Sequence, residues 1–271
     1  MINIFKHIKQ DVYVIGDIHG KFDLLEDYVK ERDFLNNCIL IVAGDCGFGF
    51  KPLHAYIWQM EILNFTLSLK NIILYFIRGN HDDPSYFSEN KINFSNIKTI
   101  PDYSIIEVGN ENILCIGGGL SIDRVYRKNE DNARKEIYDS IEPKIDFFPS
   151  YWENELPNYN EEKLHEIHES GIILNYVITH TSPSFCFKYG IQGLEKWIES
   201  DDTLLDDLHK ERDIMSNIYD NLVENKQPIK KWIYGHFHKH HEENINSIHF
   251  ITLFNIEIIL DVYHLNNENM F

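Results

Sequence analysis

Short apolar runs recur along the chain, and each of them stops at a glycine or at a polar residue. β-Branched and aromatic side chains dominate these runs, as is typical of buried strands. The predicted strands cover Val12–Ile15, Cys38–Ala43, Ile72–Ile77, Tyr176–Thr179 and Trp232–Tyr234. Helical periodicity follows the first two of them, over Phe22–Arg32 and Leu53–Leu69. This alternation predicts a largely parallel sheet that is covered by helices on both faces.

Two further pairs of apolar runs have the pattern of β-hairpins. The first pair is Tyr103–Val108 and Asn112–Ile116, which flank a Gly-Asn turn. The second pair, near the end of the chain, is Ile248–Leu253 and Ile256–Val262. Both pairs predict antiparallel additions to the parallel sheet.

Two stretches fit the sheet poorly, and we interpret them as candidate caps within a single domain of residues 1–271. Residues 120–170 mix charged, aromatic and proline residues. Residues 190–227 have the pattern of acidic amphipathic helices. Their apolar positions are Leu204, Leu205, Leu208, Ile214, Ile218 and Leu222. Ordinary packing helices explain the second stretch equally well.

Polar side chains follow five of the predicted strands, within two or three residues of the strand end. In chain order they are Asp17, Asp45, Asn80, His180 and His236. Ligand sites of open α/β sheets lie beyond the carboxyl ends of the strands. We therefore expect these side chains to meet there, although they are far apart in the sequence.

The residues around these positions are those that bind divalent cations. Asp17 and His19 are two residues apart in a Gly-Asp-Ile-His-Gly segment, and His236 and His238 repeat that spacing after Gly235. Carboxylates, imidazoles and amide oxygens are ligands of hard and borderline cations. Two such ions about 3.5–4 Å apart can hold a phosphoryl group and activate water. The sequence supplies a carboxylate to bridge such a pair and enough ligands for both ions.

The blocks GDIHG, GD, GNHD, a strand-end histidine and GHFH occur in this order over residues 12–240. In this arrangement the chain resembles the calcineurin-like metallophosphoesterase superfamily. The resemblance implies an α/β fold of four layers, in which two mixed sheets are flanked by helices with cap-like helical insertions. It also implies a phosphoesterase in which a hydroxide that bridges two metals attacks phosphorus in line.

The resemblance assigns a role to each residue of these blocks. Asp17, His19 and His238 would bind the first metal, and Asp45 would bridge the two. Asn80, His180 and His236 would bind the second metal. His81 would contact the phosphate and protonate the leaving oxygen, for which an imidazole is suited because its pKa lies near neutrality. A rival pairing of His238 with His240 remains open, although Gly235 favours His236 with His238.

The second block departs from that of the phosphoprotein phosphatases, which carry GDxVDRG. Here the block is Gly-Asp-Cys-Gly-Phe-Gly, without the second aspartate that orients the catalytic histidine and without the arginine that binds phosphate. Asp82 or Asp83 could orient His81 instead. Arg124 and Arg127 are candidates for the phosphate contact, in a GG-x-S-x-D-x-x-x-R block that resembles a bacterial and phage branch of the superfamily. Surface ion pairs explain these two arginines equally well.

Composition narrows the class of substrate and the compartment. The formal net charge is −18, which disfavours DNA or RNA as a partner because nucleic-acid binders usually carry a basic face. No apolar segment is long enough to span a bilayer, and the four cysteines form no CxxC pair, so we expect a cytoplasmic protein. The oligomeric state stays open.

The sequence thus predicts hydrolysis of small phosphomonoesters or phosphodiesters, such as nucleotides, cyclic nucleotides, dinucleoside polyphosphates or phosphorylated small molecules and peptides. The cofactors would be two divalent ions, with Mn²⁺ expected first and Fe, Zn²⁺ or Ni²⁺ as alternatives, since mixed nitrogen and oxygen ligands do not select among them. A metal-dependent nuclease is the alternative enzyme. A protein that binds a phosphorylated ligand without turnover is the alternative from another class.

Overall fold

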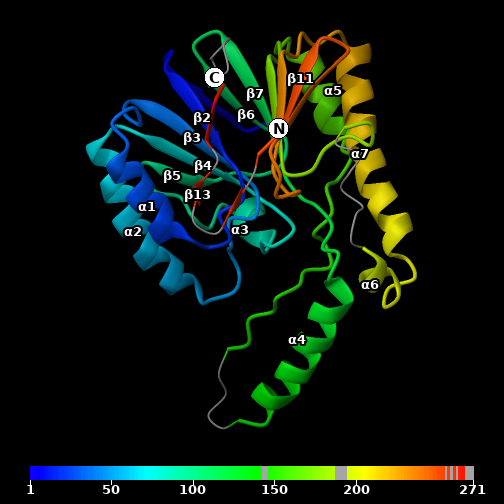
Figure 1. The fold of residues 1–271 in the computed structure, drawn as a ribbon. Helices are drawn as coiled ribbons and strands as arrows, with labels where there is room; N and C mark the ends of the chain where they lie inside the picture. Colours follow the sequence, from blue (N-terminus) through cyan, green and yellow to red (C-terminus); the bar gives the residue numbers. More distant parts are fainter. Residues whose placement is uncertain (142–145, 187–193, 254, 257–258, 261, 266–271) are drawn as a thin grey trace.

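The two central sheets of the protein pack face to face between two layers of helices, as the computed structural model shows (Figure 1). The structure describes residues 1–141, 146–186, 194–253, 255–256, 259–260 and 262–265. This is the four-layer arrangement that the sequence predicts.

Parallel strands form most of the smaller sheet, whose order is β14-β2-β3-β4-β5. Its strands are β2 (Asp11–Ile15), β3 (Cys38–Ala43), β4 (Ile73–Ile77), β5 (Ile97–Thr99) and β14 (Val262–His264). Helices α1 (Phe22–Glu31) and α2 (Leu53–Leu69) cross over between the first three strands, as predicted. The predicted bounds of β2, β3, β4, α1 and α2 hold to within one residue, whereas β5 was not predicted.

The larger sheet is mixed, with the order β1-β6-β7-β8-β9-β11-β10. Its strands are β1 (Ile4–His7), β6 (Ser104–Val108), β7 (Glu111–Ile116), β8 (Tyr176–Thr179), β9 (Lys231–Tyr234), β10 (His241–Ile245) and β11 (Ile248–Thr252). Strands β6 and β7 form the first predicted hairpin. Strand β1, which the apolar pattern does not predict, pairs in parallel with β6 at the edge.

The second predicted hairpin is wrong. Strand β11 pairs with β10 and β9, whereas the residues expected as its partner are divided among β12 (Asn255–Ile256), β13 (Ile259–Leu260) and the start of β14. Strand β14 then pairs antiparallel to β2, at the edge of the other sheet. The chain end therefore links the two sheets, a long-range pairing that local patterns do not reveal.

Three apolar clusters explain the order of the layers. Isoleucines such as Ile41, Ile77, Ile178 and Ile233 fill the space between the sheets. The outer face of the smaller sheet packs on α1 and α2, and that of the larger sheet on α5 (Glu161–Glu169) and α7 (Leu204–Glu224). Trp232 is fully buried there, and its indole N–H donates to Thr179 Oγ1 at 2.9 Å, so its one polar group is satisfied.

The two predicted insertion segments differ from each other. Helix α4 (Arg124–Asp139) extends away from the body, and the chain returns along it towards α5 (Figure 1). In the second segment, α7 buries Met215, Ile218 and Leu222 against the larger sheet. This part of the segment therefore contains an ordinary packing helix, the alternative that the sequence left open. Short helices α3 (Ser85–Ser88) and α6 (Glu195–Ile198) complete the helices of the described chain. Whether either segment acts as a cap stays a prediction.

All four cysteines, Cys38, Cys46, Cys115 and Cys186, are buried and free. None of the described helices combines the length and the apolar character needed to cross a membrane.

Candidate metal centre

The register of the two sheets brings the five polar strand ends to one place. Ile15 of β2 is level with Val42 of β3, and Ala43 of β3 is level with Ile77 of β4. In the other sheet Thr179 is level with Tyr234. Each predicted ligand lies one to four residues beyond one of these strand ends. The two sheets therefore present their carboxyl ends to a common site, as expected for an α/β protein.

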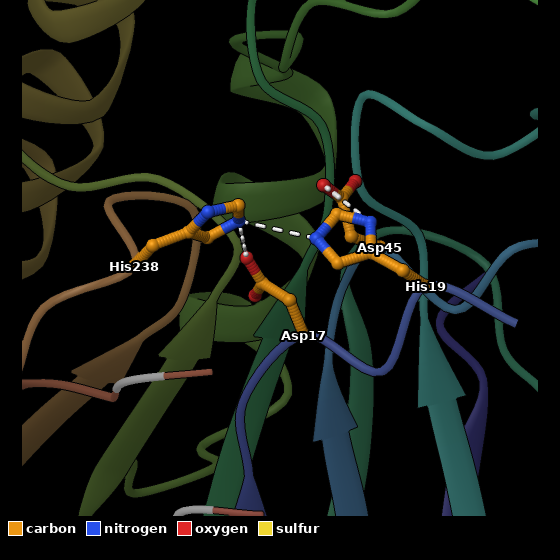
Figure 2. Close-up of side chains that lie close together, drawn as sticks. All are labelled: Asp17, His19, Asp45 and His238. Atoms are coloured by element: carbon orange, nitrogen blue, oxygen red, sulfur yellow. Dashed lines mark hydrogen bonds and ion pairs between the residues drawn. The ribbon is translucent and has the colours of Figure 1, made fainter. Parts of the chain in front are cut away.

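Four side chains converge at the outer part of this site (Figure 2). Asp17, His19, Asp45 and His238 each offer one ligand atom, and these atoms all lie within 4.8 Å of one another. His238 Nε2 lies 3.1 Å from His19 Nε2 and 3.1 Å from Asp17 Oδ2. A proton on His238 Nε2 could form a hydrogen bond with either His19 Nε2 or Asp17 Oδ2, but not a good one with both. A metal cation among the three atoms would interact favourably with the lone pairs of all of them. The donor set of two imidazoles and two carboxylates therefore fits a divalent metal.

A second group lies deeper, on the other side of Asp45. His180 Nδ1 donates its proton to the Ala43 carbonyl oxygen at 2.8 Å, so the neutral ring has its lone pair on Nε2. That Nε2 faces Asn80 Oδ1 at 2.9 Å and Asp45 Oδ1 at 3.3 Å. The His236 ring packs against His180, with 4.9 Å between the ring centroids. Three lone pairs that face one another are unfavourable unless a proton or a cation lies among them.

The electrostatic environment around Asp45 and His180 favours a bound cation. Burial alone would raise the pKa of Asp45, but His180, His81 and His19 outweigh it and hold the pKa well below its usual range. Burial would likewise lower the pKa of His180, yet Asp45 and Asp17 raise it to about 10. The centre therefore attracts positive charge, which bound metals would supply in place of protons.

Several residues of the centre have a left-handed backbone conformation. His19, Asp45, His236 and His238 all adopt positive φ angles, of 44°, 45°, 71° and 50°. Such left-handed conformations cost a non-glycine residue about 1–3 kcal/mol and cluster at functional sites. In this chain they turn four of the seven predicted ligands towards the centre.

Two glycines of the motifs are required by close packing on the ligands. A Cβ on Gly79 would lie 2.0 Å from Asp45 Oδ1, and a Cβ on Gly235 would lie 2.1 Å from Asp17 Oδ1. Any side chain at either position would displace a predicted ligand.

The sequence profile of the calcineurin-like phosphoesterase family matches residues 11–240, which is most of the chain and includes every predicted ligand. The chain belongs to this family. It is therefore a hydrolase of phosphate esters, from a family that depends on two metals. No curated protein is significantly similar to the chain.

Solved structures that share parts of this architecture are remote in sequence. A dimetal phosphatase from Danio rerio is 13% identical, with 90% of this chain and 87% of that chain covered and a TM-score of 0.48. A candidate 5′-nucleotidase from Staphylococcus aureus is 15% identical, with coverages of 91% and 48% and a TM-score of 0.43. A cold-active protein-tyrosine phosphatase from a Shewanella species is 15% identical, with coverages of 68% and 69% and a TM-score of 0.30.

Ser121 and Glu155 form a hydrogen-bonded chain behind Asn80. The sequence did not reveal this support of the candidate metal centre. The Asn80 Nδ2–H donates to Ser121 Oγ at 2.9 Å, and the Ser121 hydroxyl donates to Glu155 Oε2 at 2.6 Å. Because the amide nitrogen is held by Ser121, the amide oxygen points at His180 and the deeper metal position. Burial raises the pKa of Glu155 to about 8. Glu153, two residues earlier, is by contrast 85% exposed and pairs with Lys128.

Glu211 of α7 is a second buried carboxyl group near the centre that sequence reasoning missed. Its Oε1 lies 3.7 Å from His236 Nε2, and burial raises its pKa to about 7. In the sequence, Glu211 has the same pattern as the other acidic residues on the solvent-exposed face of a helix. The sequence therefore gave no reason to predict a role for it.

The interpretation of Asp82 as the residue that orients His81 is corrected by the structure. The Asp82 carboxylate accepts four backbone N–H groups, from Cys46, Gly47, Phe48 and Gly79, at 2.7–2.9 Å. It therefore holds the loop that carries Asp45. Among the described residues the buried His81 Nδ1 has no hydrogen-bond partner. Burial and the Asp45 charge raise the pKa of Asp82 to about 7.

The two candidate phosphate arginines have different surroundings. Arg124 is engaged elsewhere, because its guanidinium pairs with Asp201 at 2.6 Å and with Asp207 at 2.7 Å. The structure therefore does not support Arg124 as a phosphate ligand; it ties the two insertion segments together. Arg127 also pairs with a carboxylate, Asp123 at 2.8 Å, but it lines a cavity of about 460 Å³ together with His19, His81 and His238. Arg127 is the arginine that the geometry leaves as a candidate.

The structure also distinguishes between the two possible histidine pairings of the last block. His238 faces Asp17 and His19, whereas His240 Nε2 lies 3.0 Å from Glu242 at the surface. The rival pairing of His238 with His240 therefore does not describe this site.

Proposed function

We propose that this phosphoesterase hydrolyses phosphomonoesters or phosphodiesters of small molecules, with two Mn²⁺ ions held by the seven predicted ligands. The observation that carries the proposal is that both groups of ligands share Asp45, whose carboxylate lies 3.8 Å from His19 Nδ1 through Oδ2 and 3.3 Å from His180 Nε2 through Oδ1. A carboxylate with one oxygen towards each group is the bridge that a metal pair needs.

Side chains of the protein itself would bind and orient the substrate. Two divalent ions, when bound, neutralise charge on the phosphoryl oxygens and make water more acidic. His81 lies at the rim of the centre, and its backbone N–H donates to Asp45 Oδ1 at 2.8 Å, which fixes its position beside the bridge. Its imidazole can then protonate the departing oxygen. Arg127 would bind a phosphoryl oxygen from the adjacent cavity.

The net charge of −18 favours small substrates over a long polyanion. Preferential cleavage of labelled DNA or RNA in the presence of Mn²⁺ would instead support the nuclease alternative. Retention of an unaltered nucleotide by the purified protein would support binding without turnover.

The proposal is tested with 4-nitrophenyl phosphate and bis(4-nitrophenyl) phosphate as substrates of the full chain. Turnover is expected with Mn²⁺ and is expected to stop with EDTA. Asp45→Asn should lower kcat/KM by more than about 100-fold, because even residues that only support metal ligands contribute roughly 10- to 100-fold. Asp27→Asn, at a carboxylate that is 68% exposed on α1, is the matched control and should retain activity. Full turnover after rigorous metal removal would refute the proposal.

A further inference from the structure

Two cavities adjoin the candidate metal centre, one lined by Asn80 and His236 of the inner group and the other by His19 of the outer group. One has a volume of about 370 Å³ and the other of about 460 Å³, and His81 and His238 line both. Each lies within the range of roughly 300–1,000 Å³ that is usual for small-molecule sites. The centre therefore has one space beside the inner group of side chains and another beside the outer group.

Each cavity has at least one partly exposed aromatic side chain and a lysine in its lining. Trp197, Phe237 and Lys239 line the first cavity, and Lys196 lies over the Trp197 ring at 4.2 Å. Phe50 and Lys51 line the second, together with Tyr56, which is only 1% exposed. Aromatic faces bind planar rings by stacking, and a nearby cation favours an anionic or electron-rich group. The two cavities thus offer the same kind of surface twice.

The two lysines are available for a ligand. Within the described part of the chain, neither Lys51 nor Lys239 forms an ion pair, although the protein carries 43 acidic residues. In contrast, Arg124 and Lys128 are engaged by carboxylates nearby. A lysine and a partly exposed aromatic ring in each of the two cavities indicate a ligand that extends into both.

From this arrangement, and resting on the proposed function, we infer that the preferred substrate is a phosphodiester with a planar ring on each side of the scissile phosphorus. In its hydrolysis, a water oxygen bonds to phosphorus while the bond from phosphorus to one ester oxygen breaks. The departing oxygen takes a proton through His81, and the second water proton is released with the monoester. His81 lines both cavities, so it lies beside whichever ester oxygen departs.

The test removes one aromatic surface at a time. Phe50→Ala and Trp197→Ala are compared on bis(4-nitrophenyl) phosphate, which has two rings, and on 4-nitrophenyl phosphate, which has one. Each variant should lower kcat/KM for the diester by about tenfold, as expected for loss of one stacked ring. The monoester can use only one cavity, so at least one of the two variants should leave its kcat/KM within about twofold.

Matched controls come from the exposed face of α2. Trp58 is 68% exposed and Phe65 is 64% exposed, and neither lines either of the two cavities. Trp58→Ala and Phe65→Ala should therefore leave kcat/KM unchanged for both substrates. Phe50 also packs on Trp152, with 5.1 Å between ring centroids, so its replacement could affect folding. Lys51→Glu and Lys239→Glu therefore serve as surface variants, each of which should raise KM for the diester.

Calorimetric titration in EDTA separates this inference from the proposed function. Without turnover, the wild-type protein should bind the diester more tightly than the monoester, and both Phe50→Ala and Trp197→Ala should weaken diester binding. If Mn²⁺ supports no turnover but this binding preference persists, the proposed function fails, while recognition of a two-ring diester by the two cavities stands. The inference is overturned if turnover is normal but both variants bind and hydrolyse the diester like the wild type. It is also overturned if both variants lower kcat/KM for the diester and the monoester equally.

Discussion

The two halves of the candidate metal centre are built from similar side chains but differ in their surroundings. In the outer half His19 is 30% exposed and His238 is 51% exposed. In the inner half His180 is fully buried and Asn80 is 3% exposed. The inner residues Asn80 and His236 also have carboxyl groups behind them, through Ser121 and Glu155 and through Glu211.

This difference teaches how rigidity is distributed over the site. Side chains held by buried hydrogen bonds keep their geometry whether or not an ion is bound, so the inner position is preorganised. The outer histidines must be ordered by the ion that they bind. We therefore expect the inner ion to be retained and the outer ion to exchange readily with solvent.

The strongest test of this comparison replaces one histidine in each half. His180→Ala should lower activity by more than about 100-fold and the free energy of unfolding by about 2 kcal/mol, because it leaves the Ala43 carbonyl without its buried donor. His238→Ala should lower activity as well, but raised Mn²⁺ should restore most of it, with a stability change below about 0.5 kcal/mol. Mn²⁺ titrations and urea denaturation measure both effects. Equal responses of the two variants would remove the distinction between the halves.

A smaller effect is expected from the support of Asn80. Ser121→Ala removes the acceptor that holds the amide nitrogen, so the amide can turn and present nitrogen to the metal. Glu155→Gln places an amide against the Ser121 hydroxyl and disturbs the same orientation. Each should weaken Mn²⁺ affinity or activity by roughly 10- to 100-fold. Glu153→Gln, at an exposed neighbour, is the control and should have no effect. Wild-type Mn²⁺ affinity in Ser121→Ala would show that Asn80 needs no such support.

The smallest effect is expected from the ion pair that anchors the segment with Ser121. The Arg124 backbone N–H donates to the Ser121 carbonyl oxygen, and the Arg124 side chain is fixed by Asp201. Arg124→Met should lower the free energy of unfolding by about 1–2 kcal/mol and activity by less than about threefold. Arg134→Met, at an arginine that is 38% exposed on α4, is the control.

The pH dependence of this ion pair follows from Asp201. The hydrogen bond from Arg124 is the largest cause that lowers the Asp201 pKa from its usual 3.8. A carboxyl group with a lowered pKa stabilises the fold above its unfolded pKa, and this contribution is lost as the pH falls through the folded pKa. The stability difference between Arg124→Met and the wild type should therefore stay constant down to about pH 4 and shrink only below it. Urea denaturation at several pH values measures it, and a difference that shrinks already near neutrality would contradict this account.

Sequence patterns predicted the parts of the molecule in which local chemistry determines structure. The strands before Asp17, Asp45 and Asn80 are continuous apolar runs that end at glycine or arginine, so their bounds and the place of their ligands could be inferred. Parallel strands must end at a shared edge, which is why the convergence of distant ligands could also be expected.

The parts that could not be predicted depend on contacts between distant segments. Glu155 lies in an irregular segment and Glu211 in a helix of many acidic residues, and nothing local separates either from solvated neighbours. Asp82 has the residue type of a histidine-orienting group, yet four backbone N–H groups of a distant loop hold it instead. The pairing of β14 with β2 likewise joins chain ends across the whole molecule.

Crystals of the protein grown or soaked with Mn²⁺ give the most direct test of the central claim, through the anomalous diffraction of the metal. The account predicts two peaks about 3.5–4 Å apart, one among Asp17, His19 and His238 and one among Asn80, His180 and His236, with Asp45 between them. The outer peak should weaken first as EDTA is added. A single peak, or two peaks that do not share Asp45, would contradict the account.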